Sequence, residues 1–147
     1  MKTLTGLLAT IMMVGLWAGH NLAQSSVSPS GTLLVLIKGI QDQDGELMVA
    51  LYSDKQPFMV GEPLLGARKS ISGSAVLVRF EKVPYGHYAV AVLQDLNNNS
   101  RMDRNLLGIP SEGYGFSNNA SGRCGPPTFD QASFVFCEKV QSKIIDV

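Results

Sequence analysis

The chain has 147 residues, with 12 Lys and Arg against 12 Asp and Glu and a hydrophobic fraction of 45%. This length corresponds to one domain, and the hydrophobic fraction is high enough for a packed core rather than a disordered chain. A net charge near zero lacks the basic field that a nucleic-acid or anionic-membrane binder needs. We therefore expect a single folded domain and no nucleic-acid partner.

Residues 1–24 have the pattern of a secretory signal peptide. Lys2 is their only charged residue, and an apolar run from Leu7 to Ala18 precedes a short stretch of small and polar residues. This run is shorter than the about 20 residues that cross a bilayer. We predict export to the periplasm or the extracellular space, no transmembrane segment in the mature chain, a short linker at residues 25–31 and a single domain at residues 32–147.

The rest of the chain repeats short runs rich in Val, Ile, Leu, Phe and Tyr, separated by turn residues. The predicted strands are residues 33–40, 46–53, 73–80, 87–94, 132–137 and 140–146, with a seventh at 68–71. Alternation places Val76, Val78 and Phe80 on one face, which we expect to face a core. About seven short strands without a helical pattern predict an all-β fold, an antiparallel β-sandwich.

The connections between these strands differ in character. Asp44-Gly45 between the first two strands predicts a β-hairpin. Residues 54–67 read as a surface excursion. Residues 95–131 show neither a strand nor a helix pattern, and such a long connection is uncommon in a compact domain unless something orders it. We expect this long loop to be ordered and to carry the function.

The beginning of the long loop has the spacing of a calcium-binding loop. Oxygen-bearing side chains stand at relative positions 1, 3, 5 and 9, which are Asp95, Asn97, Asn99 and Asp103. Position 7 is Arg101, which can offer its backbone carbonyl. The spacing predicts a structural Ca²⁺ site. The alternative is a polar turn without an ion, because Asn and Asp side chains often bond their own backbone.

The predicted site departs from an EF-hand. Leu106 stands at position 12 in place of a bidentate Glu, and Ser100 at position 6 in place of Gly. Five local ligands are fewer than the about six to eight oxygens that calcium takes. Glu112, the next carboxylate along the chain, is our candidate to complete the shell.

Four segments carry a family resemblance. They are FEKVPYGHYAVAV at residues 80–92, DLNNN from residue 95 with Asp103, GIPSEGYGFSNN at residues 108–119 and GPPTFDQA at residues 125–132. Together they resemble the DUF2141 family of exported bacterial proteins. The Pro-x-Gly-x-Tyr-x-Val element from Pro84 is similar to a strand start in transthyretin-like (prealbumin-like) and Cna-B-like sandwiches. The resemblance implies this fold and export, and it implies no mechanism. Ser100 departs from it, since the family usually has Gly there.

Cys124 and Cys137 are the only cysteines, and twelve residues separate them. In an exported chain a disulfide is the natural interpretation, with two free thiols as the alternative. The family pattern includes neither cysteine.

Catalytic candidates are few. His87 is the only histidine after the predicted signal peptide, and Glu112 with Asp130 could form a pair of carboxylates. Tyr114, Phe116 and Phe129 could stack on a sugar or peptide, or pack the loop onto the sandwich. Our hypothesis is an exported accessory or binding module of the cell envelope, with an envelope protein, peptide or glycan as partner. The alternative is a small hydrolase that uses the loop carboxylates or His87.

Overall fold

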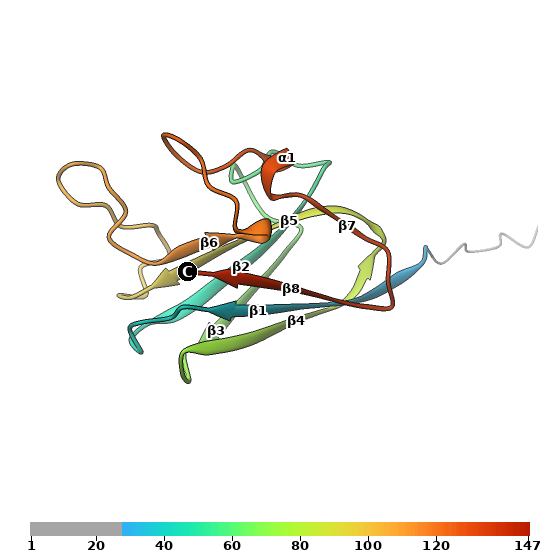
Figure 1. The fold of residues 1–147 in the computed structure, drawn as a ribbon, viewed down its shortest axis with the longest axis horizontal. Helices are drawn as coiled ribbons and strands as arrows, with labels where there is room; N and C mark the ends of the chain where they lie inside the picture. The colour runs from blue at the N-terminus through green and yellow to red at the C-terminus, as the bar shows by residue number, and fades with distance from the viewer. Residues whose placement is uncertain (1–27) are drawn as a thin grey trace, which may run out of the picture.

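The computed structural model describes residues 28–147. The predicted signal peptide and the first part of the predicted linker therefore lie outside the described residues. The elements, shown in Figure 1, are β1 (Ser30–Lys38), β2 (Glu46–Ser53), β3 (Leu65–Ser70), β4 (Ala75–Pro84), β5 (Gly86–Asp95), β6 (Tyr114–Phe116), the 3₁₀ turn η1 (Ser117–Asn119), α1 (Phe129–Ala132), β7 (Phe134–Phe136) and β8 (Val140–Asp146). The fold is all-β, as predicted, and β1 begins inside the predicted linker.

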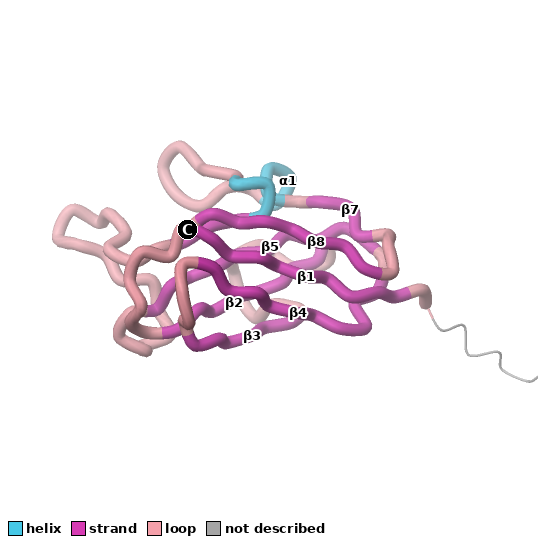
Figure 2. The backbone as a smooth tube through the Cα atoms, turned by 60° about the horizontal axis from the view of Figure 1, so that its bottom comes forward, coloured by secondary structure: helices cyan, strands magenta, loops and turns pink. Residues whose placement is uncertain are grey.

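The strands form two sheets. The smaller sheet has the order β4-β1-β8, and the larger one has the order β3-β2-β5-β6, with β7 also paired to β5 (Figure 2). All pairs are antiparallel except β1 with β8, which run parallel. The prediction of a purely antiparallel sandwich is corrected at this pair. Parallel neighbours need a long connection, and here nearly the whole domain forms it.

The predicted hairpin at Asp44-Gly45 is wrong. β1 pairs only with β4 and β8, whereas β2 pairs with β3 and β5, so the connection between β1 and β2 crosses from one sheet to the other. Gly45 has a φ of +75°, and a Cβ there would overlap the backbone carbonyl of Asp95. The glycine is needed because the chain passes against the end of β5, rather than because two strands turn back on each other.

One core lies between the sheets. The predicted inward face of β4 is confirmed, since Val76, Val78 and Phe80 are buried together with residues of β1, β2, β5, β7 and β8. Tyr88 belongs to this core, and its hydroxyl donates to the Pro84 carbonyl at 2.8 Å. Burial, and secondarily the Asp54 carboxylate, raises the pKa of Tyr88.

A second apolar cluster covers the outer face of the larger sheet. Tyr52, Phe116 and alanines of β5 and α1 are buried there, with Phe58 and Phe129 packed against them. The Phe58 ring centroid lies 6.1 Å from that of Phe116 and 6.0 Å from that of Phe129. Two of the three aromatic residues considered for a stacking platform therefore pack the loops onto the sheet, and only Tyr114 remains exposed.

The long loop contains three short elements that the sequence did not predict, namely β6, η1 and α1. α1 begins with a capping box in which Thr128 and Gln131 bond each other's backbone amides. In the part of the chain that the structure describes, no helix is long and apolar enough to cross a membrane.

Ser117 joins these elements to β5, and its replacement by alanine should destabilise the domain. β6 and β7 pair with successive parts of β5, and the fully buried Ser117 hydroxyl lies between them, accepting from the Val90 amide at 2.9 Å and donating to the Ala132 carbonyl at 2.5 Å. Ser117→Ala would leave both groups unsatisfied, so the free energy of unfolding should fall by about 1–3 kcal/mol. Urea unfolding measures this loss, with the exposed Ser142→Ala as control. Equal losses for the two variants would contradict it.

Candidate metal centre

The predicted calcium loop begins where β5 ends. Asp95, the last residue of β5, is fully buried, and its two carboxylate oxygens accept from the backbone amides of Asn99 at 3.0 Å and Ser100 at 2.7 Å. The loop therefore curls back around the carboxylate. A tightly curled backbone of this kind is what the spacing predicted.

Asn97, Asn99 and Asp103 lie together on the open side of this curl. The side-chain amide of Asn97 donates to Asp103 at 2.6 Å, and that of Asn99 donates to both Asp103 oxygens at 3.0 Å. The amide oxygens of Asn97 and Asn99 accept from backbone amides two residues further on, at 3.1 and 2.8 Å. The four predicted side-chain ligands are therefore brought into one hydrogen-bonded network.

Glu112 closes the loop in a way that the sequence did not predict. Its carboxylate is buried, and its two oxygens accept from the amides of Leu96 at 3.0 Å and Asp103 at 2.9 Å. It thus ties the two ends of the predicted loop together. Each carboxylate oxygen has more than one lone pair, so this role leaves it able to face a cation as well.

The turn of the loop is strained and braced from outside. Asn98 and Ser100 have φ values of +59° and +65°, a left-handed region that Asn tolerates but that costs a residue such as Ser about 1–2 kcal/mol. The Ser100 hydroxyl accepts from the Arg68 guanidinium at 2.7 Å, and Arg68 is also paired with Glu46. Arg68 and Glu46 come from β3 and β2, so this brace was missed because it depends on which strands lie beside β5.

The donor set suits a hard cation such as Ca²⁺. It contains only oxygen ligands from carboxylates, amides and a backbone carbonyl, with no His or Cys, which excludes the preferred chemistry of zinc. Within residues 28–147 no three His, Cys, Asp or Glu side chains form a preformed cluster. The Asp103 charge faces the amide donors of Asn97 and Asn99. A cation at Asp103 would have to take the place of these two donors.

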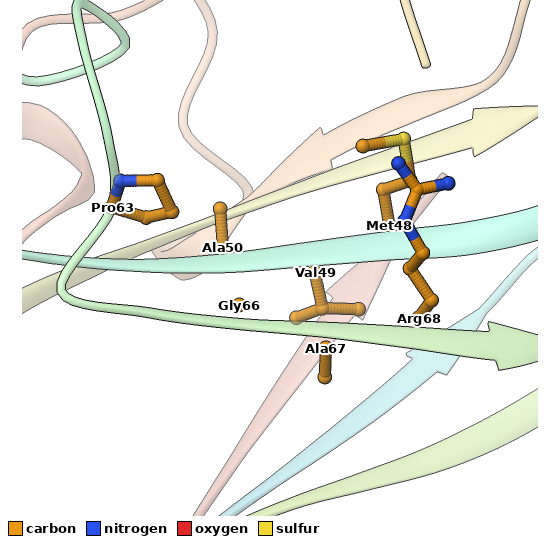
Figure 3. Close-up of a pocket in the computed structure, with 7 residues that line it drawn as sticks. All are labelled: Met48, Val49, Ala50, Pro63, Gly66, Ala67 and Arg68. Carbon is orange, nitrogen blue, oxygen red and sulfur yellow. The ribbon is translucent and has the colours of Figure 1, made fainter. Parts of the chain in front are cut away.

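Two depressions lie on the same sheet. One, of about 420 Å³, lies over β2 and β3; Figure 3 shows Met48, Ala50 and Pro63 along it, with Arg68 leaning over one end. The other, of about 410 Å³, is lined by Tyr114 and Phe116 of β6, by residues of the 102–110 segment and by residues of the loop before α1. The lining of both is mainly apolar, and neither includes a carboxylate or a histidine.

The structure does not join the two cysteines. Cys124 and Cys137 are both exposed free thiols. Cys124 lies in the loop before α1, and Cys137 follows β7 at the turn to β8, so α1 and β7 separate them along the chain.

The groups considered for hydrolysis are not brought together. His87 is exposed on β5, opposite Val135 of β7. Asp130 is exposed in the first turn of α1, and both oxygens of Glu112 accept from backbone amides. Among the described residues, no hydrogen bond or ion pair links the three side chains.

The fold and this loop define a class: a two-sheet all-β domain with an Asp- and Asn-rich loop at the end of one central strand. Residues 35–144 match the DUF2141 family, described as an uncharacterized protein conserved in bacteria. The chain belongs to this family, as the four sequence segments predicted. Comparison with curated proteins and with solved structures found no match. The transthyretin-like description therefore remains a resemblance.

Proposed function

We propose that the protein is an exported accessory or binding module of the cell envelope, and that a calcium ion braces its long loop as the binding surface. The observation that carries the proposal is the convergence of Asp95, Asn97, Asn99 and Asp103 in one network, with Glu112 closing it. Turn propensity alone explains Asx residues that bond their own backbone. It does not explain why the side-chain amides of Asn97 and Asn99 both point to the Asp103 carboxylate.

Export supports the proposal because calcium is plentiful outside the cytoplasm, where a weak site can still be filled. Asp95 and Asp103 are the only carboxylates within the first nine positions. We therefore expect a dissociation constant of about 10⁻⁴–10⁻³ M, as in extracellular modules. An ion bound this weakly suits a structural role better than a catalytic one.

Calcium titration of the mature protein tests the proposal. We expect calcium to stabilise the wild type by about 1.4–2.7 kcal/mol at ten to a hundred times the dissociation constant. Asp103→Ala should largely abolish this gain because Asp95 is then the only carboxylate left within residues 95–103, while Asn97→Ala should weaken binding less. Arg101→Ala is the matched control, since only its backbone carbonyl is involved. Isothermal titration calorimetry measures the calcium affinity, and thermal melting measures the stabilisation by calcium.

Melting that is identical in millimolar calcium and in chelator would contradict the proposal. The loop would then be a polar turn held by its own hydrogen bonds. An equal calcium response in Asp103→Ala and Arg101→Ala would contradict the assigned ligands.

A further inference from the structure

A rigid turn stands beyond the candidate metal centre, at residues 104–110. The Asn105 amide donates to the Ile109 carbonyl, and the Gly108 amide donates to the Asn105 carbonyl, each at 2.9 Å. The Asn105 side-chain oxygen also accepts from the amides of Leu107 at 2.9 Å and Ile109 at 3.1 Å. The backbone of this turn is therefore preorganised by its own hydrogen bonds.

Two leucines form the apex of this turn. Leu106 has a relative exposure of 106% and Leu107 of 83%, and Ile109 beside them is half exposed. In Figures 1 and 2 the loop between β5 and β6 projects well beyond the sheets. Exposing two adjacent apolar side chains to water costs free energy, and such exposed apolar groups mark sites of interaction with a protein or a membrane. Because the apex is convex, it can insert into a lipid bilayer.

Two arginines flank the apex, and Asp103 is the one carboxylate of the loop that is not buried. Arg101 and Arg104 are exposed, and the Arg104 guanidinium donates to the Gly108 carbonyl at 2.9 Å, which holds it at the base of the turn. Asp95 and Glu112 are buried and bonded to backbone amides. A bound calcium ion would add further positive charge. Leucines with flanking arginines are the composition of an interfacial membrane contact.

We propose that the 104–110 turn docks on an anionic phospholipid surface, where Leu106 and Leu107 enter the boundary of headgroups and acyl chains while Arg101 and Arg104 contact lipid phosphates. The neutral total charge of the chain hides this local distribution. Asp42 and Asp44 are exposed in the connection between β1 and β2. This connection lies at the same end of the molecule but projects less far than the loop between β5 and β6 (Figure 1). The inference rests on the proposed function in one respect, namely that a bound calcium ion orders the loop that carries this turn.

Vesicle co-sedimentation of the mature protein tests this docking. In calcium, the protein should sediment with vesicles of phosphatidylcholine and phosphatidylglycerol and much less with phosphatidylcholine alone, and added salt should weaken the binding. The double variant Leu106→Ser, Leu107→Ser should lower the partition coefficient at least about tenfold. Arg101→Gln should lower it roughly fivefold on the anionic vesicles only. The matched control is Leu77→Ser, Ile144→Ser, which removes two half-exposed apolar side chains from the outer face of the smaller sheet.

Absence of binding to anionic vesicles would overturn the inference, and so would equal losses in the two double variants. Self-association that depends on Leu106 and Leu107, without vesicle binding, would overturn it in favour of a second copy of the chain. Calcium binding is measured by titration on the same samples. Intact calcium binding without vesicle binding overturns only the docking. Vesicle binding that depends on the leucines in a protein that binds no calcium supports the docking and overturns the calcium site.

Discussion

Asp95→Ala should destabilise the protein by about 2–4 kcal/mol in chelator and should also remove its response to calcium. Asp95 is fully buried and accepts from the amides of Asn99 and Ser100, and hydrogen bonds to a charged group contribute about 1.5–3 kcal/mol each before the cost of burying the charge. Alanine would leave both amides without their acceptor. Urea unfolding with and without calcium separates the two effects.

The matched control is Asp42→Ala, which removes one exposed acid from the neighbouring connection. We expect it to change the free energy of unfolding by less than about 0.5 kcal/mol and to keep the calcium response. Asp95→Asn should fall between these variants, because it keeps an acceptor for one amide and loses the charge. A calcium response that survives in Asp95→Ala would show that the ion, if bound, lies elsewhere.

Gly45→Ala should destabilise the protein by about 3 kcal/mol or more, although Gly45 lies in a different connection. A Cβ at this position would overlap the Asp95 carbonyl and lie 2.6 Å from the Leu96 Cα, so backbone must shift at the first residues of the calcium loop. The variant should also bind calcium more weakly. Urea unfolding measures the first effect, and calcium titration measures the second.

Gly61→Ala separates the clash from the backbone conformation. Gly61 has a φ of +82°, close to the +75° of Gly45, and a Cβ there would meet nothing within 4 Å. We expect it to cost about 1–2 kcal/mol, the penalty of a left-handed residue alone, with unchanged calcium affinity. Equal losses in the two variants would mean that close approach to Asp95 contributes nothing.

The strands with clean patterns could be predicted from the sequence, and the short or crossing ones could not. β2 and β8 have the predicted bounds, and β4 has the predicted inward face, because alternation reports which side of a strand is buried. β6 has only three residues with a glycine at its centre, so it is too short to show the alternation of apolar and polar residues that identifies a strand. Asp44-Gly45 specifies a turn, but whether the strands it joins pair depends on the rest of the fold.

The candidate site divides in the same way. The spacing of Asp95, Asn97, Asn99 and Asp103 predicted that they would lie together, because a tight loop is a local structure. The brace from Arg68 to Ser100 joins residues 32 positions apart. Its prediction needs the pairing of β3 with β2 and of β2 with β5, and the local sequence does not encode which strands become neighbours.

The parallel pair of β1 and β8 also determines when the domain can fold. β1 lies at the centre of the smaller sheet and pairs on one side with β8, the last strand of the described chain, which contributes the fully buried Ile145. Until β8 has been synthesised, one edge of β1 is unpaired and one side of the core is exposed. Pairing across such a sequence separation is slow, in the range of milliseconds to seconds for β folds. A nascent chain therefore cannot complete this core until β8 is available to pair with β1.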